Sequence, residues 1–526
     1  MIVKSPFPDV EIPAETVYDY VFGSLTAADL DRVAVVDGGR SITFAELKAD
    51  IDRFAGALAA RGVRPGDVVA LHSPNSIGFV IAFHGILRAG ATATTINVLY
   101  SPTEIAAQLR DSNASRYVTV SPVLPNAVAA ADEAGLPTEH MIVLDSACGF
   151  ESLASLLGEA TPPPDVTVDP SALAVLPYSS GTTGRAKGVM LTHSNLVANI
   201  AQCTPMLRIT SDDAVSAVLP FFHIYGMNVI MNLTLRQRGK LVTLPKFDLP
   251  EFLRQISAYE CTYLFIAPPV AVALAKHPIV EQFDVSSVRV IVCGAAPLDE
   301  ALGNALMARL QCRLLQGFGM TELSPVSHVT PIDDPDISIG SIGVAVPNIE
   351  FKIVDPETGT EITYVEGARS RPGEMLVRGP GVMHGYLGNP EATAATIEPN
   401  GFLHTGDIVE VGPKGEVYVV DRLKELIKYK GYQVPPAELE ALLLTHPAIA
   451  DAAVVPYPDT EAGEIPRAFI VTQPGAEVFP DEILDYVAAR VAPHKRIRML
   501  EFIDAVPKSL SGKILRKDLK GRPVAQ

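Results

Sequence analysis

One stretch of the chain combines glycines, hydroxyl groups and a lysine in the way that phosphate binding requires. The segment at 178–188 reads YSSGTTGRAKG. Glycines let the backbone approach an anion closely, hydroxyl groups donate hydrogen bonds, and a lysine adds positive charge. The residues that supply these groups are Ser179, Ser180, Gly181, Thr182, Thr183, Gly184, Lys187 and Gly188. We interpret the segment as a polyphosphate-binding loop that follows an apolar strand and precedes a helix beginning near His193.

The loop differs from the Walker pattern GxxxxGK[ST]. Lys187 is followed by Gly188, so the hydroxyl that would hold magnesium there is missing. A flexible Ser/Gly linker is the alternative interpretation. The apolar strand patterns that flank the segment argue against a linker.

Three further segments carry side chains that could take part in chemistry. The first, LPFFHIYGM at 219–227, contains a histidine among aromatic residues, for which a core histidine is the alternative. The second, QGFGMTE at 316–322, ends in a hydroxyl and a carboxylate, and a hard cation such as Mg²⁺ favours carboxylate oxygen. A glycine turn that caps a helix would explain Thr321 but not this order of residues. The third, FLHTGD, ends in the carboxylate of Asp407.

Lysines concentrate in two segments near the end of the chain. In DRLKELIKYKGYQV at 421–434, Lys428 and Lys430 alternate with apolar residues, as on the solvent face of an edge strand. In PKSLSGKILRK at 507–517, Lys513 follows a glycine turn, and an ordinary solvated tail is the alternative there.

The elements that must position these residues alternate between strands and helices. A helix starts at Thr43, which forms a capping box with Glu46, and ends at Gly62. Strands are expected at 67–73, 116–121 and 172–180, and helices at 80–90, 101–112 and 192–203. Such alternation indicates βαβ units and an α/β fold with largely parallel, doubly wound sheets.

The pattern of expected secondary structure changes after residue 340. Short alternating strands at 350–355, 373–379 and 415–421 predict a small antiparallel sheet or barrel. After Asp421 we expect a separate, mobile α+β domain with strands at 427–434, 449–457 and 467–473 and helices at 436–447 and 480–491. The expected division is an N-terminal domain at 1–420 and a C-terminal domain at 421–526, with a hinge near 421–424.

Composition restricts the class of protein. The chain has 526 residues, of which 48% are hydrophobic and 19% charged, so it can bury large cores in two or more domains. Its formal net charge of -18 offers no basic face for nucleic acid. The most apolar window, 78–96, contains His84 and Arg88 and predicts a buried helix followed by a turn, not a membrane span.

The remaining compositional signals concern cysteines and the first residues. The five cysteines show no metal-ligand spacing, and we expect them to be reduced core residues. The first residues form no signal peptide, which predicts a cytoplasmic protein.

The motifs together resemble those of the adenylate-forming superfamily, which includes acyl-CoA synthetases, peptide-synthetase adenylation domains and beetle luciferases. SSGTTGRAKG is similar to its phosphate-loop signature, although Ala186 stands where many members have proline. The resemblance covers nearly the whole chain, and the segment from Asp421 to Pro456 is most similar to 4-coumarate–CoA ligases. It implies an ATP- and Mg²⁺-dependent enzyme that forms an acyl-adenylate and then transfers the acyl group to coenzyme A.

The resemblance also implies roles for individual residues. The expected ATP- and AMP-binding residues are Ser179, Ser180, Gly181, Thr182, Thr183, Gly184, Lys187, Gln316, Gly317, Phe318, Thr321, Asp407, Arg422 and Lys424. Glu322 is the expected metal ligand. The expected catalytic residues are Lys513, Lys428, Gln433 and His223. The acyl pocket is expected to be lined by Tyr225, Gly294, Ala295, Gly317, Pro325 and Val326, and CoA to contact Lys246, Lys430 and Gly431.

The sequence defines the carboxylic acid substrate less closely than the type of reaction. Val292 stands where plant 4-coumarate ligases often have a lysine directed at the ring hydroxyl, which favours cinnamate or an aliphatic acid over a phenol. We expect 4-coumarate- or cinnamate-type acids, with a medium- or long-chain fatty acyl-CoA or acyl-AMP ligase as the alternative. Carrier-protein loading and luciferase-like monooxygenation fit less well. A catalytically idle nucleotide-binding protein would have lost ligands that are all present here.

Overall fold

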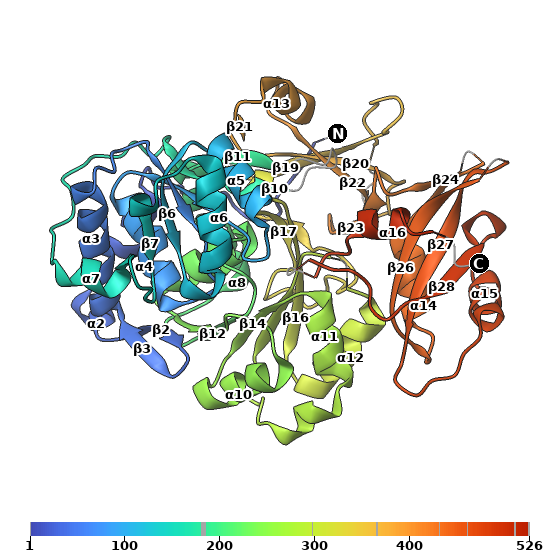
Figure 1. The fold of residues 1–526 in the computed structure, drawn as a ribbon. Coiled ribbons are helices and arrows are strands. Elements are labelled where there is room, and N and C mark those ends of the chain that lie inside the picture. The colour runs from blue at the N-terminus through green and yellow to red at the C-terminus, as the bar shows by residue number, and fades with distance from the viewer. Residues whose placement is uncertain are drawn as a thin grey trace.

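The computed structural model describes residues 2–179, 186–296, 298–363, 367–430, 432–459, 461–509 and 512–523, and only the backbone of Gln433. Figure 1 shows a large N-terminal body, drawn in blue to orange, and a smaller C-terminal domain in orange-red beside it. Within the described residues the strands form four sheets. The expected large α/β domain followed by a small α+β domain is confirmed.

Two nine-stranded sheets form the centre of the body. The first has the order β10 (Tyr178–Ser179), β11 (Lys187–Thr192), β9 (Leu173–Val175), β5 (Thr92–Thr95), β4 (Val68–Leu71), β6 (Ala114–Thr119), β7 (Met141–Val143) and β8 (Glu151–Ser152), with β21 (Gly385–Tyr386) paired to β11. The second has the order β18 (Val344–Ala345), β17 (Val326–Val329), β16 (Arg313–Gly319), β15 (Val290–Cys293), β14 (Tyr263–Ile266), β12 (Ala214–Ala217), β13 (Lys240–Thr243), β2 (Val33–Asp37) and β3 (Arg40–Thr43). Central pairs in both sheets are parallel, as the alternation of strands and helices predicts.

Helices cover both faces of the first sheet. Val69 and Leu71 of β4 belong to the large core with α3 (Phe44–Ala60) and α4 (Ile77–Arg88). Ala70 between them belongs to a second core with α5 (Pro102–Asp111) and α6 (Leu124–Ala134). Because successive strand residues point to opposite faces, the sheet is doubly wound. The capping box of Thr43 with Glu46 and the buried helix in the 78–96 window are confirmed.

The remaining helices of the body connect these strands or cover their edges. They are α1 (Val17–Phe22), α2 (Ala27–Leu30), α7 (Leu153–Gly158), α8 (His193–Leu207), α9 (Leu233–Arg236), α10 (Leu249–Tyr259), α11 (Pro268–Lys276), α12 (Glu300–Leu310) and α13 (Pro390–Thr396), together with the π-helix η3 (Tyr225–Asn232).

A five-stranded antiparallel sheet follows the two large sheets. Its order is β1 (Val3–Lys4), β19 (Glu350–Val354), β20 (Gly373–Arg378), β22 (Leu403–Val411) and β23 (Val417–Arg422). Among the described strands, β1 and β23 are its two edges, so the expected sheet or barrel is an open sheet.

The C-terminal domain has a five-stranded sheet of its own. Its strands are β25 (Tyr432–Val434), β24 (Ile427–Tyr429), β27 (Gly463–Thr472), β26 (Ile449–Asp459) and β28 (Met499–Phe502), and its helices are α14 (Pro436–Leu444), α15 (Pro480–Ala488) and α16 (Arg516–Lys520). Ala452 and Val454 face one core, and Ala453 and Val455 face another, so this sheet too is covered on both faces.

Two sequence expectations about elements are wrong. The segment 427–434, expected to be one strand, is a hairpin of β24 and β25, and Lys430 in its turn has a φ of 47°. Cys148 is exposed and Cys312 partly buried, whereas Cys203, Cys261 and Cys293 are buried as expected. All five cysteines are free.

The last strand of the body includes the start of the expected hinge. Asp421 and Arg422 still pair with β22, and the next sheet begins at Ile427. The chain therefore changes from one sheet to the other at 423–426.

Burial of His84 predicts how stability changes with acid. The ring has no solvent exposure, both of its nitrogens lack hydrogen-bond partners, and burial lowers its pKa from 6.5 to about 3. Below pH 6.5 the unfolded chain protonates this imidazole and the folded protein does not, so stability is lost as the pH falls. We expect His84→Leu to reduce the dependence of the unfolding free energy on pH by about 1.4 kcal/mol per pH unit between pH 6 and 5. Urea unfolding at several pH values measures this, and an identical slope in the two proteins would contradict it.

Candidate active site

The expected phosphate loop is bounded by an antiparallel hairpin. Ser179 of β10 pairs with Lys187 of β11, and residues 180–185, which include Ser180, Gly181, Thr182, Thr183 and Gly184, lie outside the described residues. The helix α8 begins at His193, as expected, with Thr192 as its N-cap. The strand β11, which the sequence analysis did not predict, lies between the loop and this helix.

A buried carboxylate lies beside this hairpin. Glu322 is 6% exposed, and its Oε1 accepts hydrogen bonds from Ser179 Oγ at 3.0 Å and from the hydroxyl of Tyr386 at 2.9 Å. The Lys187 ammonium lies 4.7 Å from the centre of the Tyr386 ring. An acidic oxygen and a lysine from distant segments thus lie at the start of the loop. This donor set suits a hard cation that also binds phosphate oxygens.

A second carboxylate is buried where two strands of the five-stranded sheet pair. Asp407 of β22 is 2% exposed, and its Oδ1 lies 3.0 Å from Arg422 Nε on β23. Among the described residues its Oδ2 has no hydrogen-bond partner, and burial raises the pKa of the carboxyl. An unpaired buried oxygen of this kind requires a donor, which the hydroxyl groups of a ligand can supply.

The C-terminal domain brings Lys513 to this carboxylate. A Cβ atom on Gly512 would lie 3.0 Å from the Ala267 side chain and 3.1 Å from Pro269, so this turn is docked on the body just before α11. Gly512 has a φ of 82°, which favours glycine. Burial, and then the charge of Arg422, lower the pKa of Lys513, while Asp407 acts in the opposite direction.

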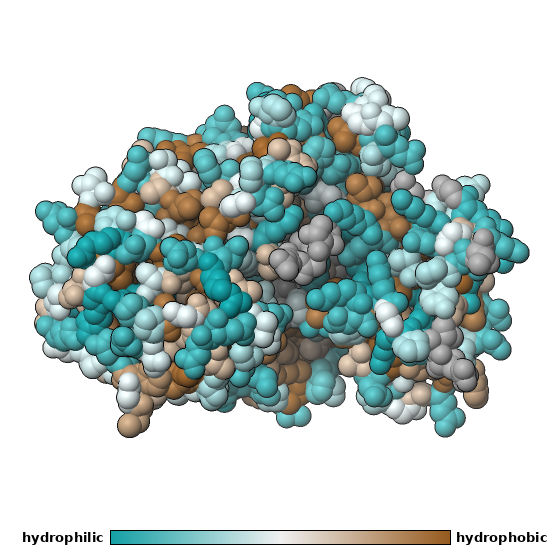
Figure 2. Space-filling model, turned by 45° about the horizontal axis from the view of Figure 1, so that its top comes forward, coloured by the Kyte–Doolittle hydropathy of each residue, from teal (hydrophilic) through white to brown (hydrophobic). Residues whose placement is uncertain are grey.

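His223 lies close to the same lysine. Its side chain is accessible to solvent but is surrounded by many protein atoms. These surroundings and the positive charge of Lys513 lower the pKa of the imidazole to about 4. Figure 2 shows the hollow between the large body and the C-terminal domain from one side. Lys513 therefore lies near His223 and the Asp407–Arg422 pair at the domain junction.

Two of the residues expected in the acyl pocket, Tyr225 and Gly294, lie against each other. Tyr225, at the start of η3, packs against Gly294, where an added Cβ would lie 3.0 Å from the tyrosine ring. The Tyr225 hydroxyl is 3.5 Å from the Val292 carbonyl oxygen. Ala295 is exposed, with a φ of 73°.

The strand β16 and the turn after it supply further expected residues. Gly317 and Phe318 are half-buried on β16, Thr321 is half-buried, and Pro325 and Val326 are buried. Gln316 is different, because its side-chain amide bonds to the backbone of Leu298 and Ile339. That amide holds neighbouring segments together and is not directed at a ligand.

Buried asparagines that the motifs did not reveal hold these segments in place. Asn75 donates to the carbonyl oxygens of Ala217 and Leu219, each at 2.9 Å, and accepts from Phe221 N at 2.7 Å. Asn199 bonds to both backbone groups of Val326. A polar side chain within an apolar helical run, as in LVANIAQ, is the signal that could have indicated Asn199. Tyr386 has no local signal, since it lies far in sequence from Glu322.

The lysines expected at the hinge or in thioester formation are exposed to solvent in this arrangement. Lys428 and Lys430 are exposed on the β24–β25 hairpin, and Lys246 and Lys424 are also exposed. Gly431 and the side chain of Gln433 lie outside the described residues. The structure therefore presents Lys513, and not Lys428, to the body.

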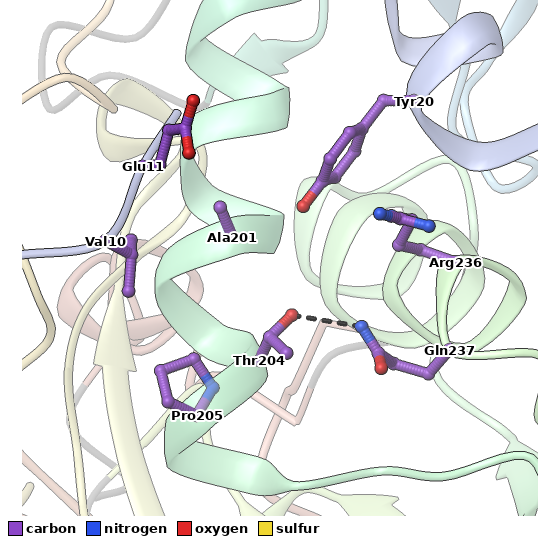
Figure 3. A pocket seen from close by; sticks show the side chains of 8 residues that line it. All are labelled: Val10, Glu11, Tyr20, Ala201, Thr204, Pro205, Arg236 and Gln237. Carbon is purple, nitrogen blue, oxygen red and sulfur yellow. Dashed lines mark hydrogen bonds between the residues drawn. The ribbon is translucent and has the colours of Figure 1, made fainter. Parts of the chain in front are cut away.

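A cavity of about 400 Å³ lies elsewhere, between the N-terminal segment and helices α1, α8 and α9. Figure 3 shows Arg236 beside Tyr20 in this cavity, and Gln237 bonded to Thr204 at 3.2 Å. None of its lining residues belongs to the expected site.

The described part of the chain contains no group of three or more His, Cys, Asp or Glu side chains able to hold a metal ion. A magnesium ion held by one carboxylate and phosphate oxygens needs no such group. The same part of the chain includes no helix long and apolar enough to cross a membrane.

Comparison with known proteins places these features in a family. Residues 25–387 match the model of the AMP-binding enzyme family, and residues 438–513 match that of the AMP-binding enzyme C-terminal domain. The chain is 42% identical to 4-coumarate–CoA ligase 5 of Oryza sativa subsp. japonica and 42% identical to a 4-coumarate–CoA ligase of Pinus taeda, in each case over 100% of this chain and 98% of the relative.

Solved structures agree with this relation. The anthranilate CoA ligase AuaEII in complex with anthranoyl-AMP has a TM-score of 0.88 at 27% identity, covering 97% of both chains. ATP-bound MatB from Rhodopseudomonas palustris has a TM-score of 0.85 at 28% identity, covering 96% of this chain and 98% of that one. With both family models matched in order and relatives similar over their full length, the chain belongs to the AMP-binding enzyme family.

Proposed function

We propose that this protein is an ATP-dependent acid–CoA ligase of the 4-coumarate–CoA ligase type. The observation that carries the proposal is the docking of the Gly512–Lys513 turn on the body, which brings a lysine to the Asp407–Arg422 pair. Relatives named 4-coumarate–CoA ligase, similar over their whole length, support the same activity.

In the first half-reaction a carboxylate oxygen of the acid attacks the α-phosphorus of ATP, and pyrophosphate leaves. The product is an acyl-adenylate, in which AMP is a good leaving group. The charge of Lys513 would bridge the attacking carboxylate and the α-phosphate, where negative charge gathers. The Oδ2 atom of Asp407 would accept hydrogen bonds from the ribose hydroxyl groups, and Arg422 would lie beside them. Glu322 would hold Mg²⁺, which neutralises charge on the phosphates.

The other expected contacts belong to the same step. The phosphates would be bound by Ser179, Lys187 and residues 180–184, and Thr321 would contact the α-phosphate. The adenine would lie along Gly317 and Phe318, and Gln316 would fix the strand behind them. His223 would adjoin the carboxylate of the acid.

In the second half-reaction the thiol of CoA attacks the acyl carbonyl carbon, and AMP leaves. We propose that the C-terminal domain first rotates about a hinge near 421–424, which withdraws Lys513 and presents the hairpin face. Lys428 and Gln433 would then assist catalysis, Lys424 would lie at the hinge, and Lys246, Lys430 and Gly431 would line the path of CoA. Two half-reactions on one carbon require different groups, and a mobile domain can present them in turn.

The acid is proposed to be an arylpropenoic acid of the cinnamate or 4-coumarate type. Tyr225 and Gly294 give the proposed pocket a flat wall, and Val292 in place of a lysine provides no cation for a phenol. Ala295, Gly317, Pro325 and Val326 would complete an apolar lining. That lining also suits a medium- or long-chain fatty acid, which is the second candidate.

A panel of acids tests the proposed function. Cinnamic, hydroxycinnamic and C6 to C16 acids are assayed for AMP release with ATP and Mg²⁺, with and without CoA. We expect CoA-dependent AMP release, highest with cinnamic or hydroxycinnamic acid. A preference for C8 to C16 acids would favour the fatty acid candidate. Failure of every acid to exchange labelled pyrophosphate into ATP would refute the proposal.

Two lysine variants are expected to damage different half-reactions. Lys513→Ala should lower pyrophosphate–ATP exchange by about 10² to 10³, the usual cost of one lost preorganised contact to developing charge. It should leave thioester formation from synthetic acyl-adenylate and CoA nearly unchanged, and Lys428→Ala should do the reverse. Equal losses in both assays for both variants would contradict alternating use of the two lysines.

Glu322→Gln is expected to weaken the use of magnesium. Because one carboxylate ligand is lost, the Mg²⁺ concentration for half-maximal pyrophosphate exchange should rise by about tenfold or more. Tyr386→Phe removes only the hydrogen bond to this carboxylate and should have a smaller effect. The measurement is a Mg²⁺ titration of the exchange rate, and an unchanged midpoint for Glu322→Gln would exclude the carboxylate as a ligand.

A further inference from the structure

A buried ion cluster lies directly behind the Lys513 turn. The guanidinium of Arg516, whose side chain is 12% exposed, donates to Glu425 through Nη1. It donates to Glu440 Oε2 at 2.6 Å through Nη2 and to the Val454 carbonyl oxygen at 3.3 Å through Nε. Each nitrogen of the guanidinium therefore has a partner, and these partners come from the turn after β23, from α14 and from β26.

Glu425 connects this cluster to the large domain. Its backbone N–H donates to the Arg422 carbonyl oxygen at 2.9 Å, and the Arg422 side chain lies 3.0 Å from Asp407. A polar route thus runs from Asp407 through Arg422 and Glu425 to Arg516. Figure 1 shows β23 next to α16, which begins at Arg516, at the junction of the two domains.

Arg516 is coupled to Lys513 by a short, internally bonded stretch. Ser509 N donates to the Lys513 carbonyl oxygen at 2.8 Å, and Lys513 N donates to Ser509 Oγ at 3.1 Å. Leu515 N donates to the Pro507 carbonyl oxygen at 2.8 Å. Because these hydrogen bonds make the turn compact, we expect its position to depend on Arg516, which anchors it to the cluster. The position of the guanidinium would then determine the position of Lys513.

The carboxyl groups of Asp421, Glu425 and Glu440 lie around this guanidinium, and Glu425 also lies near Lys513. Burial, opposed by the charge of Arg516, raises the pKa of Asp421 to about 7 and also raises that of Glu440. Removing the guanidinium would leave the buried carboxyl group of Glu440 without its ion-pair partner. The cluster therefore depends on this one side chain.

Building on the proposed function, we infer that Arg516 is a positioning residue for adenylation. Its ion pair with Glu425 fixes α16, and with it the Lys513 turn, against the turn at 423–426 that follows β23, in the orientation that presents Lys513 to Asp407 and His223. Thioester formation proceeds with Lys513 withdrawn, so it does not need the lysine to be held in this place.

Two variants and two assays test the inference. Glu425→Gln keeps the shape of the side chain and removes its charge, and Arg516→Lys keeps the charge and removes the fork of donors. We expect each to lower kcat for pyrophosphate–ATP exchange by about tenfold to a hundredfold, because Lys513 is misplaced and not removed. The KM for ATP should change by less than threefold, and thioester formation from synthetic acyl-adenylate by less than twofold.

Lys517→Ala is the matched control. Lys517 is an exposed neighbour on α16, and its loss should leave both assays unchanged. A purely structural role of the cluster would lower both half-reactions together, since the same domain carries Lys428, and that result would overturn the inference. So would normal exchange in Glu425→Gln, which remains informative if Arg516→Lys does not fold. Absence of exchange in the unaltered protein would refute the proposed function instead.

Discussion

The ion pair between Asp407 and Arg422 is the interaction on which the candidate site depends. It joins β22 to β23 at the last strand of the body, and it leaves one carboxylate oxygen buried without a donor. Burying such an oxygen costs free energy unless it accepts a hydrogen bond. The proposed nucleotide site therefore contains a buried acceptor that a ligand hydroxyl group could satisfy. The same strand carries the chain into the C-terminal domain. Binding and domain orientation therefore share one structural element.

Around this pair, the body supplies some of the expected site residues and the C-terminal domain supplies Lys513. Parallel strands and buried asparagines hold the segments that contain His223, Tyr225 and Val326. The Gly512–Lys513 turn instead reaches the body across a domain junction, by close contact with Ala267 and Pro269. Arg516 and Glu425 connect that turn to the strand that carries Arg422. If the C-terminal domain rotates as proposed, Lys513 would be present in the first half-reaction and withdrawn in the second.

Much of the fold could be predicted because its signals are local. The capping box at Thr43, the start of α8 at His193 and the buried helix in the 78–96 window each depend on residues within a few positions of one another. The prediction failed where a turn depends on unusual backbone geometry. Lys430 adopts a positive φ, and the expected strand at 427–434 became a hairpin. The strand β11 also escaped notice, because a short apolar run before a helix carries no periodic signal of its own.

By itself the sequence determined which chemical groups the protein has and in what order: the glycine and hydroxyl loop, the carboxylates Glu322 and Asp407, and a lysine on a glycine turn. Their types and spacing are recognisable because binding a phosphate or a metal ion, or forming a glycine turn, requires particular residues within one short segment. Only the tertiary structure decided that Tyr386 bonds to Glu322, that Asn75 and Asn199 hold the segments around the site, and that Lys513 and not Lys428 faces the body. These are contacts between residues far apart in the chain. They are fixed by packing and by the burial of charge, and neither leaves a pattern in any one stretch of sequence.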